Sequence, residues 1–325
     1  MRHHSFVLLS LLMIAALTLV ACAKRDDPQS HLKAGQAALD KGDTATAIRE
    51  LEAVIAADPK ATEARVVLGR AYEKAGQQDD AINQYRAALA LESPDAQAAY
   101  HLAALLISAG KPAEAVLPLA TGVKLNAAMA VSYTNEISSA IKAGLAAGNA
   151  LVNAGKAAEA IEQYRAVLAL DPNNVSATTN MGAAYYQLGK LDEAIAQFQA
   201  ALKLAPADAE THYLLGAAYI QKNWVAQARA EFEAAIQSNP KLAAAYIGLG
   251  NARLLQNDPE GAVTSLTQAV QLAPNQPEAL YALGKALMMK SDKAEARQAF
   301  QRFLALNPPP NRRAEVEEWL KQLGP

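Results

Sequence analysis

Apolar residues recur along most of the chain with the spacing of amphipathic helices, and the pattern returns every 34 residues. The clearest marker is an alanine that mostly follows an acidic or small residue. It stands at Ala47, Ala81 and Ala115, and again at Ala160, Ala194, Ala228, Ala262 and Ala296. Self-similarity at one period indicates a repeat protein, so the chain contains eight copies of one unit. Each copy is predicted to form two amphipathic helices.

Three further positions of the unit are restricted in size. Twelve residues before the marker the side chain is absent or small: Gly35, Gly69, Ala103, Gly148, Gly182, Gly216, Gly250 and Gly284. Four residues after it the side chain is large: Leu51, Tyr85, Leu119, Tyr164, Phe198, Phe232, Leu266 and Phe300. Twelve residues after it proline is common, with Ser93 and Ala127 as exceptions. The pattern predicts that small residues let the two helices approach closely while large ones fill the remaining gap.

Glycines mark the turn between the two helices, near Gly76, Gly110, Gly155 and Gly189. One helical hairpin cannot bury its own apolar face, so successive units are expected to stack. Arg253 stands where the other copies favour tyrosine or leucine, and we expect it to alter the local packing.

These positions resemble those of the tetratricopeptide repeat, as the copy from Val175 to Asp208 shows best. The resemblance covers residues 28–310. It implies an all-α fold, a right-handed superhelical solenoid of about eight helix-turn-helix repeats plus a C-terminal capping helix. In this family the first helices of the repeats line a concave face.

The register divides the array into repeats 1–3, residues 28–129, and repeats 4–8, residues 141–310. Between them the period slips by the eleven residues Ala130 to Ala140. Because Asn126 to Asn153 contains no proline, we expect the first helix of repeat 4 to be extended at its start. The extension is either a surface insertion without a task or a projecting helix that docks a partner.

The last segment, residues 311–325, is expected to cap the array. Asn311 can cap a last helix that runs to about Leu323, in which Val316, Trp319, Leu320 and Leu323 share one face. Arg312, Glu315, Glu318 and Lys321 are expected to face water.

The N-terminal residues 1–21 have the pattern of a secretory signal, because an apolar run from Phe6 to Val20 follows a weakly basic start. The run ends at Ala21-Cys22, which resembles the lipobox of bacterial lipoproteins. The resemblance implies that Cys22 carries diacylglycerol and an N-acyl group, that residues 22–30 form a lipidated tether, and that the protein lies in the outer membrane facing the periplasm. The alternatives are an ordinary signal peptide and an uncleaved anchor helix.

Composition and charge narrow the function. The chain has 325 residues, 52% hydrophobic and 6% aromatic, with a formal net charge of −2. No basic surface for nucleic acid is expected, and the single cysteine excludes intramolecular disulfides. The histidines outside the signal, His31, His101 and His212, fall in separate repeats and are interpreted as structural. No catalytic motif, cofactor motif or metal-ligand spacing stands out, so we expect a non-catalytic protein without a cofactor or small-molecule substrate.

The candidate binding residues follow from the family resemblance. The positions that match the concave face carry Tyr100, Asn149, Asn180, Tyr186, Tyr213, Asn251, Tyr281, Lys285 and Met288. Asparagine amides can bond both polar groups of a peptide backbone, and tyrosines add rigid apolar area with a polar tip. The hypothesis is a groove for a polypeptide segment; the alternative is that these tyrosines only pack helices together.

The sequence therefore predicts an interaction scaffold, anchored to the bacterial envelope, that supports assembly of a complex of the pilus or secretion type. The alternative is an adaptor in polysaccharide export or at peptidoglycan that binds a glycan or a hydrolase.

Overall fold

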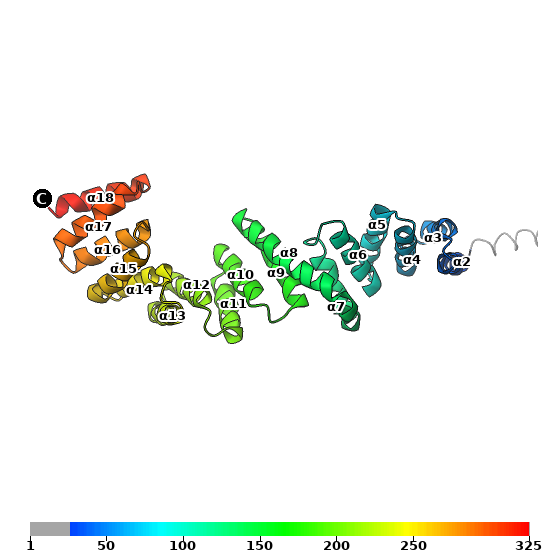
Figure 1. Cartoon of the computed structure of the whole chain (residues 1–325), viewed down its shortest axis with the longest axis horizontal. Coiled ribbons are helices and arrows are strands. Elements are labelled where there is room, and N and C mark those ends of the chain that lie inside the picture. The colour runs from blue at the N-terminus through cyan, green and yellow to red at the C-terminus, as the bar shows by residue number, and fades with distance from the viewer. Residues whose placement is uncertain (1–26, 325) are drawn as a thin grey trace, which may run out of the picture. The chain divides into compact units, whose positions relative to one another are not determined.

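The computed structural model describes residues 27–324, in which seventeen α-helices and one 3-10 helix occur and no strand. The α-helices alternate as first and second helices of eight successive repeats, followed by one more helix (Figure 1). The first helices are α2 (Pro28–Asp40), α4 (Thr62–Lys74), α6 (Ala96–Ser108), α8 (Thr134–Asn153), α10 (Val175–Gln187), α12 (Ala209–Gln221), α14 (Ala243–Leu255) and α16 (Pro277–Met289). The second helices are α3 (Thr44–Ala57), α5 (Gln78–Leu89), α7 (Val116–Leu125), α9 (Ala157–Leu170), α11 (Leu191–Leu204), α13 (Val225–Ser238), α15 (Pro259–Leu272) and α17 (Lys293–Ala305). The all-helical repeat fold is confirmed.

The helices form two compact units. The first extends to Ala147 and includes Ala169–Pro172; the second contains Gly148–Leu168 and continues from Asn173. Repeats 1–3 belong to the first unit and repeats 5–8 to the second, while the helices of repeat 4 contribute to both.

The close approach of paired helices rests on the small and large positions read from the sequence. A Cβ atom added to Gly182 would lie 2.7 Å from Cε1 of Phe198, and one added to Gly69 would lie 2.6 Å from Cε1 of Tyr85. These large side chains are fully buried. The same small-to-large contact joins Gly35 to Leu51, Gly148 to Tyr164, Gly216 to Phe232, Gly250 to Leu266 and Gly284 to Phe300. The prediction that small residues admit large ones is confirmed.

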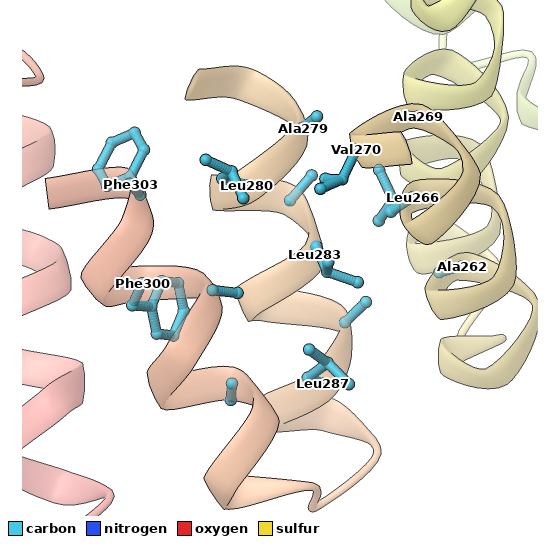
Figure 2. Packing of buried hydrophobic residues seen from close by; sticks show 14 of the residues in the cluster. Ala262, Leu266, Ala269, Val270, Ala279, Leu280, Leu283, Leu287, Phe300 and Phe303 are labelled. Atoms are coloured by element: carbon cyan, nitrogen blue, oxygen red, sulfur yellow. The ribbon is translucent and has the colours of Figure 1, made fainter. Parts of the chain in front are cut away.

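Stacking between repeats completes the core. In repeats 7 and 8, Leu266 and Val270 of α15 pack with leucines of α16, which also contact Phe300 and Phe303 of α17 (Figure 2). Each helix therefore buries apolar area against a neighbouring repeat as well as against its own partner, as expected of hairpins that cannot close a core alone.

The turn between the two helices has one conformation in all eight repeats. The seventh residue after the small position has a positive φ, which is 72° at Gly189 and 70° at Ser291. This position carries Gly42, Gly76, Gly110, Gly155, Gly189, Asn223, Asn257 and Ser291. Because a Cβ atom is disfavoured at positive φ, glycine predominates and asparagine is the usual substitute.

The inserted segment lengthens α8, although by less than the sequence suggested. The other first helices begin seven residues before their small position, whereas α8 begins at Thr134, fourteen residues before Gly148. The added seven residues make about two helical turns. The residues before it, Ala127–Tyr133, form the 3-10 helix η1. The extension of the helix is therefore confirmed, but only Thr134 to Ala140 of the inserted residues belong to α8.

A recurrent polar contact links neighbouring repeats. Tyr72 donates a hydrogen bond to Glu52 Oε1 at 2.7 Å; burial first, and this bond second, raise the pKa of Tyr72 to about 12. At the same repeat position Tyr185 accepts a bond from Arg165 and Tyr219 one from Gln199, each from twenty residues earlier.

Arg253 occupies this position too, and its Nη2 lies 3.7 Å from Glu233, again twenty residues earlier. It also donates from Nη1 to Ser265 Oγ at 2.9 Å. Arg253 therefore changes the local contact, because a charged pair takes the place of the tyrosine contact, while the helix pair α14 and α15 of this repeat is kept.

The array ends in α18 (Pro310–Gln322). Val316 is fully buried, and Trp319, Leu320 and Leu323 pack on the core of the last repeat. Pro310 begins this helix and Pro309 is its N-cap residue, so the expectation that Asn311 caps it was wrong by two residues. Proline suits the first helical residue because its missing N–H has no partner there.

The predicted signal and Cys22 lie outside the described residues. Helix α2 begins at Pro28, with Asp27 as its N-cap, so residues 28–30 of the expected tether are helical. Between residues 27 and 324 no helix has the length and apolarity needed to cross a bilayer.

Candidate binding hollow

A hollow of about 250 Å³ lies on the first helices of the second unit. Residues of α10, α12, α13 and α14 and of the start of α16 line it. Three of the predicted binding residues, Tyr186, Tyr213 and Asn251, line it together. The structure thus brings residues from three different repeats to one place.

An aromatic ring and a glycine shape the base of the hollow. Phe232 of α13 and Gly248 of α14 both line it. A Cβ atom on Gly248 would lie 2.6 Å from Cζ of Phe232, so the ring occupies the space that a side chain at residue 248 would need. The ring of Tyr213 lies against the same phenylalanine, with centroids 6.0 Å apart. The base is therefore apolar and aromatic.

Amide groups and one carboxylate line the remainder. Asn251 and Gln221 contribute exposed side-chain amides that bond to no residue the structure describes. Gln276 donates to Glu278 Oε2 at 2.9 Å, and Glu278 is the sole charged residue among those that line the hollow. Free amides beside an aromatic base suit a ligand with both backbone polar groups and apolar side chains.

The environment of Tyr213 is apolar and negative. Burial, then the charge of Glu210, then Tyr186, raise the pKa of Tyr213 above its ordinary value. The hydroxyl is therefore protonated at neutral pH and can donate a hydrogen bond.

Asn149 and Asn180 lie elsewhere in the second unit and bond to each other. Asn149 Oδ1 accepts from Asn180 Nδ2 at 2.9 Å and from the hydroxyl of Tyr164 at 2.6 Å. Their amides link repeats 4 and 5, and neither residue lines the hollow.

Tyr100 in the first unit is not a binding residue. It has an exposed fraction of 0%, stacks on Tyr133 of η1 with centroids 4.5 Å apart, and donates to the carbonyl of Asn126 at 3.1 Å. The prediction for Tyr100 was wrong because the inserted segment brings Tyr133 over it.

Tyr281 is covered by the capping helix. Its hydroxyl donates to Glu315 at 2.9 Å, Arg312 lies 4.3 Å from its ring centroid, and Trp319 packs at 5.6 Å. Arg312 and Glu315 are exposed, as the sequence predicted, and both also contact Tyr281. Lys285 also lies over the Tyr281 ring, at 5.7 Å, and Met288 packs against the core.

The histidines have structural partners. His101 Nδ1 lies 3.2 Å from Glu73 and its ring stacks on Tyr85. His212 Nδ1 lies 2.6 Å from Glu231, while its Nε2 bonds the carbonyl of Pro206 at 3.0 Å. In residues 27–324 no cluster of three histidine, cysteine or acidic side chains could hold a metal ion.

A second hollow, of about 440 Å³, lies on α2 of the first unit and includes Glu63. Leu32 and Ala37 are its apolar residues, and none of the described residues that line it is aromatic.

Sequence reasoning missed Phe232, Gly248, Gln276 and Glu278 as lining residues. One signal was present: two residues before the small position, only repeat 7 has a glycine. The shape of the hollow at Gly248 also depends on how α12, α13 and α14 pack together. The residue type at one repeat position does not predict that packing.

Comparison with family models supports the repeat assignment. A tetratricopeptide repeat model matches residues 32–85, 68–127, 213–277 and 247–309. A second repeat model matches residues 148–189 and 182–223. The chain belongs to the tetratricopeptide repeat family. The matches leave out residues 128–147, where η1 and the extension of α8 interrupt the tetratricopeptide register.

Solved structures of tetratricopeptide repeat type are similar to parts of the chain. They include MamA, 27% identical over 49% of this chain and 94% of that one, with a TM-score of 0.45. YrrB, described as having an unusual peptide-binding site, is 18% identical over 54% of this chain and 91% of its own, with a TM-score of 0.45. A thermophilic repeat protein of Thermus thermophilus is 20% identical over 55% and 97%, with a TM-score of 0.46. No curated protein sequence matches the chain.

Proposed function

We propose that the protein is a non-catalytic scaffold that binds a polypeptide segment in the hollow on Phe232. The observation that carries the proposal is the placement of the free amide of Asn251 beside the rings of Tyr213 and Phe232. The amide suits the backbone of an extended segment, and the rings suit one of its side chains. Family membership agrees, because tetratricopeptide repeat proteins are generally non-catalytic scaffolds.

The second part of the proposal concerns location. A thioether-linked lipid on Cys22 would tether the scaffold to the bacterial outer membrane, facing the periplasm. Two or more acyl chains give a stable anchor where one gives only reversible binding. From there the scaffold would hold a protein partner for assembly of an envelope complex of the pilus or secretion type.

A pull-down from envelope extracts tests the hollow. The variant Tyr213→Ala with Asn251→Ala should lose the partner that the natural chain recovers. The matched control is Asn149→Ala, which removes an asparagine at the same repeat position as Asn251 but outside the hollow. Recovery of the same partner by the double variant would reject the proposed site.

Metabolic labelling with palmitate tests the anchor separately. Cys22→Ser should incorporate no label and should leave the signal uncleaved by the lipoprotein peptidase. Label in this variant equal to that in the natural chain would reject lipidation at Cys22 and leave the hollow untouched.

A further inference from the structure

The hollow on Phe232 combines two features that select different parts of a ligand. Its base is apolar, since Phe232 lies where Gly248 leaves room, with Tyr213 beside it. Its border has one charge, the carboxylate of Glu278. Among the described residues that line the hollow, none is a lysine or an arginine.

The carboxylate of Glu278 remains available to a ligand. Gln276 occupies only Oε2, and Oε1 bonds to none of the residues between 27 and 324. Glu278 is exposed and lies in the first turn of α16, which by itself also explains an acidic residue there through the helix dipole. Glu63 has the same repeat position in α4. Glu278 differs from it because aromatic residues line the hollow beside Glu278.

A second acidic side chain adds to the negative potential at the hollow. Glu210, in the first turn of α12, is close enough to raise the pKa of Tyr213 together with burial. Both acidic groups disfavour an anionic ligand and favour a cationic one.

We propose that the hollow is selective for a segment that carries a large apolar side chain next to a lysine or arginine. The apolar side chain packs against Tyr213, Ile220 and Ile247, which line the hollow above the buried ring of Phe232. The cationic group pairs with Glu278 Oε1, and the amide of Asn251 bonds the backbone between them. This inference rests on the proposed function and adds the chemistry of the bound sequence.

The experiment is selection from a library of bead-displayed nine-residue peptides of random sequence, with the full-length chain at low salt. The natural chain should enrich peptides in which a large apolar residue lies within three positions of lysine or arginine. Glu278→Lys should enrich acidic residues there instead, and should bind the originally selected peptides about fivefold more weakly. Glu63→Lys is the control, and should leave the selection unchanged.

The apolar half is tested with Gly248→Ala, whose Cβ must displace the Phe232 ring. It should bind the selected peptides about tenfold more weakly, and far-ultraviolet circular dichroism establishes that the variant is folded. Because Glu278 is exposed, its variant tests the proposal even if Gly248→Ala does not fold.

The outcomes distinguish the selectivity of the hollow from polypeptide binding in the hollow. Enrichment of apolar peptides without a charge preference, or a preference unchanged in Glu278→Lys, would overturn the selectivity and leave the proposed function standing. Equal capture by the natural chain and by Tyr213→Ala with Asn251→Ala would overturn both.

Discussion

Tyr100 in α6 and Tyr213 in α12 occupy the same position of their repeats, three residues before the small residue, yet they have different surroundings. Tyr100 is fully buried under Tyr133, which the inserted segment supplies. Tyr213 lines an open hollow. No described aromatic ring stacks on Tyr213 as Tyr133 stacks on Tyr100; the ring contact of Tyr213 is a tilted one with the buried Phe232, at 6.0 Å between centroids.

Tyr281 in α16 extends the comparison, because it has the same repeat position and is covered by Arg312 and Glu315 of the capping helix. One position thus gives a core residue, a residue that lines a hollow and a contact of the capping helix. Whether a side chain is available to a partner is decided by the helix that follows it.

The largest effect is expected from truncating the buried tyrosine. Tyr100→Ala should destabilise the first unit by about 3–5 kcal/mol, because it removes a fully buried ring. Tyr213→Ala should cost about 1–2 kcal/mol, since its ring is partly exposed. Hydrogen exchange in α6 and in α12 measures both, and equal losses of protection would contradict the comparison.

A smaller effect is expected from removing the cover. Tyr133→Ala should cost about 1 kcal/mol for the lost aromatic pair. It should also expose Tyr100 to solvent. Nitration by tetranitromethane followed by mass spectrometry should then modify Tyr100 in the variant and spare it in the natural chain. Protection of Tyr100 in the variant would show that another group buries it.

The first unit should also lose stability in acid through Glu73, which lies between Tyr85 and His101. Burial alone raises the pKa of Glu73, but hydrogen bonds from His101 and Tyr85 outweigh it and hold the pKa below its usual range. A carboxyl whose pKa is lowered by folding stabilises the protein above its unfolded pKa, and this contribution disappears as the pH falls through the folded value.

The stability of the first unit should therefore decrease below about pH 4.5, the ordinary pKa of glutamate. Glu73→Gln should decrease less steeply over that range. The measurement is hydrogen exchange in α4 and α6, recorded for both chains at values from about pH 7 to about pH 3, which gives the stability of the first unit at each pH. Identical pH profiles for the two chains would assign the acid sensitivity to other carboxyls.

The smallest effect is expected at the turn between the two helices of a repeat, whose conformation is the same whatever the neighbouring repeat supplies. Ser291 has φ of 70°, as the glycines of the other repeats do. Ser291→Gly should stabilise the last repeat by about 0.5–1 kcal/mol, because it relieves the Cβ atom at positive φ. Urea unfolding monitored by Trp319, which packs on Phe300 of that repeat, is the measurement. A loss of stability would mean that the serine side chain makes a contact outweighing the strain.

The sequence by itself determined everything that repeats locally. The helix hairpins, the pairing of Gly182 with Phe198 and of the corresponding small and large residues in the other repeats, and the positive φ of Gly189 follow from side-chain size and backbone conformation within one unit. The resemblance to the tetratricopeptide repeat also implied that Tyr213 and Asn251 belong to one face.

Only the tertiary structure decided which of the predicted residues are free. Asn149 bonds to Asn180 while Asn251 bonds to no described residue, although both follow the small residue directly. Phe232 became the base of a hollow because the neighbouring repeat has a glycine at residue 248. The physical reason is that a repeat position specifies a direction on a helix, whereas burial and hydrogen bonding depend on the atoms that the next helix places opposite it.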